Sequence, residues 1–232
     1  MTDTFADKVI EFNKNLHFTG VLPAGISIMN PFREDEKIIP VSSEFYKKFY
    51  NDSNPRHLIL GINPGRFGGG VTGVPFTDSK RLKNECDIKY TGKETHEPSS
   101  VFVYDVIKAY GGPEAFYQKF YINSICPLGF TATGKNGKEV NYNYYDSREL
   151  TQAVLDFIIQ SIRQQIAFGI NTDVCFCFGT GKNEKFLRQL NIEQKFFKSI
   201  VALEHPRFIM QYKARTKEAY INKYLAAFHR AG

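Results

Sequence analysis

The chain has 232 residues, 42% of them hydrophobic and 23% charged, which is ordinary for a globular protein large enough to bury a core without staples. We expect a single domain over residues 1–232. The formal net charge of +6 and the pI near 9.0 favour a polyanionic partner, although the same surplus fits a soluble basic protein that has none.

Neither a secretion signal nor a membrane span is predicted. The amino terminus has no basic region followed by an apolar core. No apolar run approaches the roughly 18 residues that a membrane-spanning helix needs. We therefore expect a cytoplasmic protein that does not associate with membranes.

The four cysteines argue against a metal or cluster site, because none of them shows Cys-x-x-Cys spacing. Cys175 and Cys177 alternate with Phe176 and Phe178 in an apolar run, which is typical of reduced thiols in a buried strand. We expect neither a metal nor a cofactor.

In the amino-terminal half, apolar residues recur at helical spacing from about Thr4 to Phe18 and predict a first helix. Residues 20–40 are expected to be irregular. The remaining predicted elements are a helix capped by Ser42 or Ser43 that runs to about Tyr50, a strand over 57–63, a long charged loop over 78–100, and a helix over 101–110 capped by Ser99 or Ser100.

The carboxyl-terminal half alternates strands and helices. The predicted elements are a strand over 120–125, a polar loop over 131–145, a long helix over 148–166, a strand over 173–179, a helix over 182–190, a strand over 199–203 and a helix over 216–228. This order predicts an α/β fold, a three-layer α/β/α sandwich around a central four-stranded, mostly parallel sheet.

The most informative segment follows the first of these strands. Gly61 to Phe76 contains six glycines and two prolines, so it is neither a helix nor a regular strand. A glycine-rich turn directly after an apolar strand lies at the carboxyl edge of the sheet, where open α/β sheets bind ligands. The turn lacks the spacing of a dinucleotide fingerprint and the Gly-Lys-Ser/Thr of a Walker loop.

Three polar residues are expected to meet at that edge, because each lies at or near the end of a predicted strand. They are Asn63, Asn123 and His205. Each also has a structural explanation: Asn63 as a turn former, Asn123 as a buried residue paired with backbone, and His205-Pro206 as a strand terminator. Their coincidence at one edge favours a functional site.

The segment from Gly61 to Phe76 resembles the first motif of the single-strand-selective monofunctional uracil-DNA glycosylases, which runs Gly-Met-Asn-Pro-Gly-Pro-Phe-Gly and continues to Thr-Gly-Val-Pro-Phe. Asn123, shortly before Cys126-Pro127-Leu128, resembles their second motif, and His205-Pro206 resembles their last. The pattern is similar to a bacterial branch of the family within the uracil-DNA glycosylase superfamily.

The resemblance implies two catalytic residues. Hydrolysis of an N-glycosidic bond passes through an oxocarbenium-like sugar, so the enzyme needs a placed water and a group that stabilises the departing base anion. Asn63 would hold the water, and a neutral His205 would donate a hydrogen bond to O2 of the base. The three motifs contain no lysine that could form a Schiff base, which argues against lyase activity.

The resemblance also implies a base-binding set. Asn123 would pair with N3–H and O4 of uracil, Phe76 would stack on the flipped base, and Ile62 would contribute its backbone N–H. Gly65 would leave room beside C5 of the pyrimidine, so that substituted uracils such as the 5-hydroxymethyl form are admitted. The other glycines of the turn are expected to serve the turn itself.

Two positions depart from the family pattern. Arg66 replaces the usual proline, which adds a charge that could contact phosphate. After His205-Pro206 the family's Ser-Pro-Arg is replaced by Arg207-Phe208, so either of these residues could fill the place of the flipped base. Alternatively, residues 208–212 begin the last helix.

The sequence therefore predicts a monomeric, monofunctional DNA glycosylase of base excision repair that removes uracil and related deaminated or oxidised bases. Two alternatives stay open. The same fold could prefer a deaminated purine such as xanthine, or the protein could be a non-catalytic module that binds DNA and senses damage.

Overall fold

A computed structural model describes residues 3–134 and 136–231. Its strands are β1 (Ile26–Met29), β2 (Arg56–Gly61), β3 (Phe120–Ser124), β4 (Gly129–Thr133), β5 (Glu139–Tyr142), β6 (Ile170–Phe178) and β7 (Ser199–Leu203). Its helices are α1 (Phe5–Asn15), α2 (Pro31–Glu34), α3 (Ile38–Phe49), α4 (Gly69–Thr72), α5 (Ser79–Asn84), α6 (Pro98–Tyr110), α7 (Pro113–Tyr117), α8 (Arg148–Ala153), α9 (Leu155–Ile166), α10 (Lys182–Gln194), α11 (Pro206–Tyr212) and α12 (Lys217–His229).

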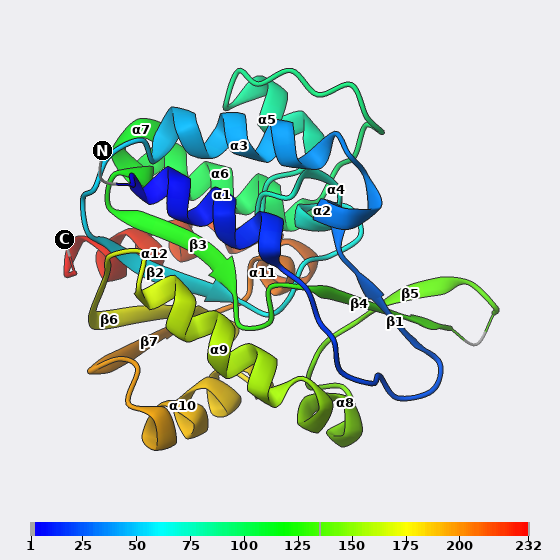
Figure 1. Cartoon of the computed structure of the whole chain (residues 1–232). Helices are drawn as coiled ribbons and strands as arrows, with labels where there is room; N and C mark the ends of the chain where they lie inside the picture. Colours follow the sequence, from blue (N-terminus) through cyan, green and yellow to red (C-terminus); the bar gives the residue numbers. More distant parts are fainter. Residues whose placement is uncertain (1–2, 135, 232) are drawn as a thin grey trace.

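The central sheet has the strand order β3-β2-β6-β7, and every pair in it is parallel (Figure 1). Leu60 lies between Asn123 of β3 and Cys177 of β6, and Cys177 pairs in turn with Ala202 of β7. The four carboxyl ends therefore meet at one edge. This confirms the predicted four-stranded α/β architecture.

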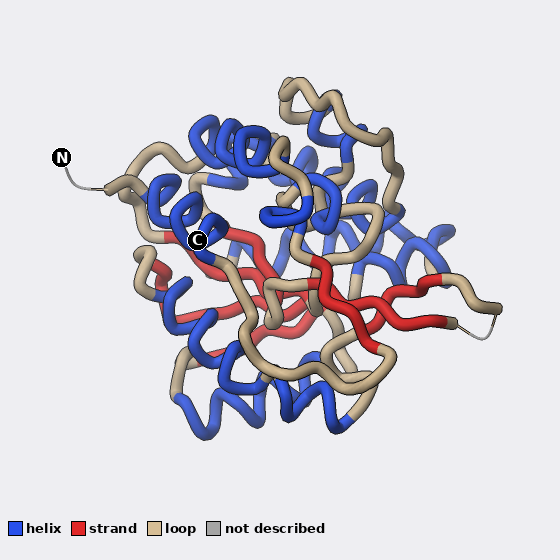
Figure 2. Tube along the Cα trace, turned by 45° about the vertical axis from the view of Figure 1, so that its right-hand side comes forward, coloured by secondary structure: helices blue, strands red, loops and turns tan. Residues whose placement is uncertain are grey.

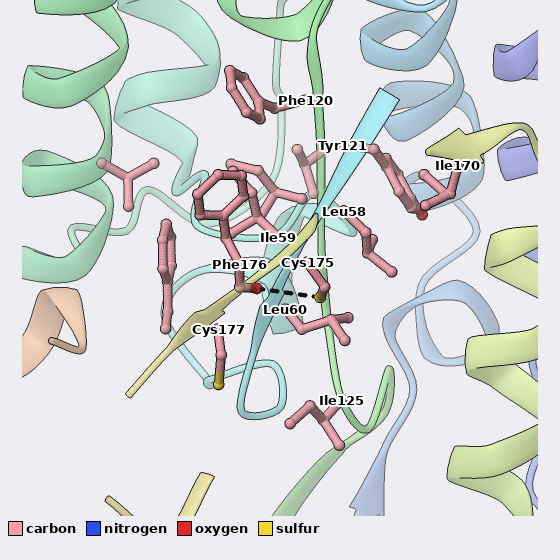
Figure 3. Close-up of a cluster of buried hydrophobic side chains, with 14 of the residues drawn as sticks. Leu58, Ile59, Leu60, Phe120, Tyr121, Ile125, Ile170, Cys175, Phe176 and Cys177 are labelled. Atoms are coloured by element: carbon pink, nitrogen blue, oxygen red, sulfur yellow. Dashed lines mark hydrogen bonds between the residues drawn. The ribbon is translucent and has the colours of Figure 1, made fainter. Parts of the chain in front are cut away.

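Both faces of the sheet are covered, which explains why its inner strands have continuous apolar runs. On one face, Phe120 and Phe176 contact Phe228 of α12. On the other face, Tyr121 contacts Phe5 of α1 and Phe168. Buried side chains of β2, β3 and β6 pack together in the core between the sheet and the helices that cover it (Figure 3).

Several helix boundaries differ from the prediction. α3 begins at Ile38, and Ser42 does not cap it but donates its hydroxyl to the carbonyl of Ile38. The predicted loop over 78–100 contains α5, which is capped by Asp78. α6 begins at Pro98, so neither Ser99 nor Ser100 is its cap. The predicted helix over 148–166 is divided at Val154 into α8 and α9.

A second, three-stranded antiparallel sheet with the order β1-β4-β5 was not predicted. The β4–β5 hairpin extends away from the body of the molecule (Figures 1 and 2). It occupies most of the segment expected to be a polar loop, and β1 with α2 occupies part of the segment expected to be irregular. The expectation was wrong because these strands have only four or five residues each, so an alternation of apolar and polar residues is easily overlooked in them.

The cysteines lie inside the protein, which the alternation with phenylalanine predicted for Cys175 and Cys177. All four are buried and unpaired, and burial raises the pKa of Cys126 to about 12. Within residues 3–134 and 136–231, no cluster of three histidine, cysteine or acidic residues could hold a metal ion. No described helix is long and apolar enough to cross a membrane.

Candidate active site

A cavity of about 150 Å³ opens at the carboxyl edge of the sheet. Residues from the end of β2, the glycine-rich turn, the start of α6, β5 and the start of α11 form its walls. Its lining includes Ile62, Asn63, Gly65, Phe76, Glu97, Ser99, Ser124, Asn141, Asn143, His205 and Arg207. This cavity is well below the roughly 300–1,000 Å³ of pockets for drug-sized ligands, so it suits a small ligand.

The glycine-rich turn folds back so that Phe76 lies over the end of β2. A Cβ atom at Gly61 would lie only 2.7 Å from the Phe76 ring, so a glycine is required there. Phe76 adopts a φ of +52°, a strained value for a bulky residue that is typical of functional sites. Its ring packs edge-on against Phe178 and lies 5.8 Å from the His205 ring, measured between centroids.

The Asn63 side chain is fixed by backbone groups at the end of β5 and just after it. Its Nδ2 donates to the carbonyl of Tyr142 at 3.2 Å, and its Oδ1 accepts from the N–H of Tyr144 at 3.1 Å. Tyr144 is itself anchored, because its hydroxyl donates to Asn183, which donates to the carbonyl of Phe178 at the end of β6. A carbonyl oxygen has two lone pairs, so Oδ1 of Asn63 retains one for a water molecule.

The tautomer of His205 follows from its role as the N-cap of α11. The backbone N–H of Arg207 donates to Nδ1 at 3.1 Å, so Nδ1 carries no proton. The ring proton of a neutral imidazole is then on Nε2, which is left as the donor for a ligand in the cavity. Burial, with a smaller contribution from the Arg207 charge, lowers the pKa of His205 to about 4. The ring is therefore neutral at physiological pH.

Asn123 is not brought into this cavity. Its Nδ2 donates to the Tyr121 hydroxyl at 2.8 Å, its Oδ1 accepts from the N–H of Ser124 at 2.8 Å, and only 5% of it is exposed. It lines a smaller neighbouring cavity that shares Pro64 and Pro75 with the first. Ser124, the next residue, lines the first cavity in its place.

The two predicted DNA-contact arginines flank the cavity. Arg66 donates from its backbone to Asn141 at 3.2 Å, and its guanidinium lies over the Phe67 ring and pairs with Glu139 at 3.5 Å. Arg207 is exposed at the start of α11. Arg66 Nε is buried and has no hydrogen-bond partner among the described residues.

Phe208 lies on α11, which is separate from the last helix, so the alternative that 208–212 begin that helix was wrong. Phe208 is 42% exposed, and its ring lies 5.4 Å from that of Tyr212. It lines a further cavity together with Ile62 and His205. The predicted positions Ile62, Asn63, Gly65, Phe76 and His205 thus share one cavity, which Phe208 adjoins.

Sequence reasoning missed Glu97, Ser124, Asn141 and Asn143, which also line the cavity. The two asparagines alternate with Val140, Tyr142 and Tyr144, a period-2 pattern that could have indicated the strand that carries them. Glu97 lies in the charged segment expected to be a loop, and nothing in its local sequence distinguishes it.

The comparisons agree with this fold. A family model described as the Uracil DNA glycosylase superfamily matches residues 47–229. The crystal structure of wild-type SMUG2 from Pedobacter heparinus is similar over 99% of both chains, with 63% sequence identity and a TM-score of 0.97. The chain therefore belongs to the uracil-DNA glycosylase superfamily, the enzymes that hydrolyse N-glycosidic bonds in DNA, and within it to the single-strand-selective monofunctional family.

Proposed function

We propose that the protein removes uracil and related deaminated or oxidised bases from DNA by flipping the base into the cavity and hydrolysing its N-glycosidic bond, without a metal or cofactor. The observation that carries this proposal is that two suitable side chains line the same cavity. One is a neutral His205, whose donor is Nε2–H, and the other is Asn63, which is fixed by Tyr142 and Tyr144. Family membership favours this enzyme over the non-catalytic DNA-binding module.

In the proposed reaction, Oδ1 of Asn63 accepts a hydrogen bond from a water that attacks C1′ of the sugar. The bond between C1′ and N1 breaks, and its electron pair leaves with the base, where negative charge spreads to O2. His205 donates a hydrogen bond to O2 without transferring its proton, which suits a ring that stays neutral. The proton released by the water passes to solvent or to the departing base.

The flipped base would stack on Phe76, and C5 of a uracil would lie beside Gly65. The N–H of Ile62 would contact the base. For Asn123 to read N3–H and O4, its amide must exchange Tyr121 and Ser124 for the base, two bonds for two. The exchange keeps the amide bonded but leaves the buried Tyr121 hydroxyl and the Ser124 N–H without these partners, so it costs binding free energy unless they find new ones.

The strand would be held at its phosphates by Arg66 and Arg207 and at a neighbouring base by Phe208. The partly exposed guanidinium of Arg66 supports a phosphate contact, because its ion pair is a 3.5 Å contact with the exposed carboxylate of Glu139, which a phosphate can replace. The exposed rings of Phe208 and Tyr212 offer a stacking surface, which is how proteins bind single strands without sequence preference. We propose that the protein acts as a monomer.

The test is incubation with a single-stranded oligonucleotide that contains one uracil, followed by alkali. We expect strand cleavage at the uracil only after alkali treatment, and none with a thymine control. Intact strands after alkali would refute the glycosylase, and cleavage without alkali would refute a monofunctional mechanism. A xanthine oligonucleotide assayed in parallel decides between the proposed preference and the purine alternative.

A further inference from the structure

Glu97 is an acidic side chain in the cavity wall to which the mechanism above gives no role. It occupies the N-cap position of α6, and its backbone N–H donates to Asp78 at 2.6 Å. Its side chain does not cap the helix but accepts a hydrogen bond from the Ser100 hydroxyl at 3.0 Å through Oε2. Its main chain and one carboxyl oxygen are thus fixed, and Oε1 has no such bond among the described residues.

The Glu97 carboxyl group lies against two glycines of the glycine-rich turn. A Cβ atom at Gly65 would lie 3.2 Å from Oε1 of Glu97, and a Cβ atom at Gly68 would overlap Oε2. Gly68 therefore permits the close approach of the Glu97 carboxyl group in addition to serving the turn.

The carboxyl group can both donate and accept near neutral pH. Burial raises the pKa of Glu97 to about 7, and the nearby Asp78 charge adds to this, while the Ser100 hydrogen bond and Arg207 oppose it. A protonated carboxyl group donates through its O–H, and an ionised one accepts. In both states it is a polar group that needs a partner when a ligand displaces its water.

We propose that Glu97 is a specificity-determining residue, whose carboxyl group fills the space left by Gly65 and makes the cavity discriminate against bases with an apolar C5 substituent, thymine above all. This inference rests on the proposed function, which places C5 of a bound uracil beside Gly65. A C5 hydrogen leaves the carboxyl group hydrated or undisturbed. The C5 methyl group of thymine is forced against the Glu97 carboxyl group, which it shields from water without forming a hydrogen bond.

The chemistry of the substituent therefore matters as much as its size. The hydroxyl of a 5-hydroxymethyl group can pair with the carboxyl group, whereas the methyl of thymine cannot. One methyl group in an apolar pocket changes specificity by about 10–200-fold, and leaving the carboxyl group covered and unpaired adds to this discrimination. Removing the carboxyl group should therefore raise activity on thymine relative to uracil by about 10-fold or more.

The experiment measures kcat/KM on single-stranded oligonucleotides that contain uracil, thymine or 5-hydroxymethyluracil, with native protein, Glu97→Ala and Glu97→Gln. We expect Glu97→Ala to raise the thymine-to-uracil ratio about 10-fold or more and to lose the preference for hydroxymethyl over methyl. Glu97→Gln keeps a polar group of the same size, so both ratios should stay near the native values. Glu94→Ala is the matched control, because Glu94 lies in the same segment but is exposed and pairs with Lys80.

Calorimetry with the free bases uracil and thymine makes the same comparison without catalysis, so a failure of the proposed chemistry stays separate from a failure of this inference. Glu97→Asp, which keeps the carboxyl group but is shorter by one methylene, should give an intermediate ratio. The inference is overturned if Glu97→Ala, or Glu97→Asp should the alanine variant not fold, discriminates between thymine and uracil as the native protein does in both measurements.

Discussion

Replacing His205 with alanine removes the donor proposed to face O2 of the departing base. Loss of one preorganised donor to a developing oxyanion lowers the rate by roughly 10²–10³-fold, which corresponds to about 2.7–4 kcal/mol of transition-state stabilisation. The effect should appear in single-turnover base release from a uracil oligonucleotide. DNA affinity should change little, because the hydrogen bond strengthens only as charge develops.

His205 also caps α11, so the alanine variant loses stability for a second reason. Its Nδ1 accepts the N–H of Arg207, and loss of an N-cap costs about 0.5–2 kcal/mol. His205→Asn separates the two effects, because an asparagine oxygen can cap the helix but supplies no group at the position of Nε2. We expect near-native stability and a reaction as slow as that of the alanine variant.

The pH dependence of unfolding gives a further check on His205. Its pKa falls from 6.5 to about 4 on folding, so the folded protein holds fewer protons. The stability that this group contributes is present above pH 6.5 and is lost as the pH falls through 4, on the order of 3 kcal/mol in all. His205→Asn should lack this part of the acid destabilisation. Native single-turnover rates in His205→Asn would refute the assignment of His205 as the oxyanion donor.

Asn63→Ala should slow base release by roughly 10²-fold, and native rates in this variant would mean that another group holds the water. Asn63→Asp should retain more activity than Asn63→Ala. It should lose ~1–3 kcal/mol of stability, because its carboxylate would face a backbone carbonyl 3.2 Å away. Asn123→Asp should lose uracil release and shift discrimination toward cytosine by about 1–3 kcal/mol, and equal uracil cleavage would show that the amide stays outside the cavity, bonded as in this structure. Arg66→Gln and Arg207→Gln should each reduce the slope of log affinity against log salt by about 0.7 on single strands, and unchanged slopes would exclude phosphate contacts. For uracil release, the native rate should decline as the pH rises through about 7 and that of Glu97→Gln should not; parallel profiles would show that Glu97 ionisation does not matter.

The central sheet could be predicted because its strands are buried on both faces. Runs such as Leu58 to Leu60 and Val174 to Phe178 are apolar without interruption, and the turn residues that follow them mark where each strand ends. The shared edge of the strands then placed Asn63 and His205 together. The order of strands and helices therefore predicted the position of the site better than any single motif did.

The remaining parts of the site depend on contacts that have no local signal. Asn63 is held by the backbone at Tyr142 and Tyr144, about 80 positions later in the chain, and backbone hydrogen bonds leave no mark on the residue types that make them. The role of Gly68 depends on Glu97, which reaches it only when α6 docks beside the turn. Asn123 shows the opposite case, where a motif residue is present but bonded within the protein.

The pKa values of the two partly buried titratable groups of the cavity are shifted in opposite directions by the same cause. Burial disfavours the charged form of each, so it lowers the pKa of His205 to about 4 and raises that of Glu97 to about 7. Arg207 lowers both values, and Asp78 raises that of Glu97. Between about pH 4 and 7 both groups are therefore mostly neutral. A neutral wall suits a base that enters uncharged and becomes an anion only as its bond breaks, because a fixed carboxylate there would oppose the charge that His205 stabilises.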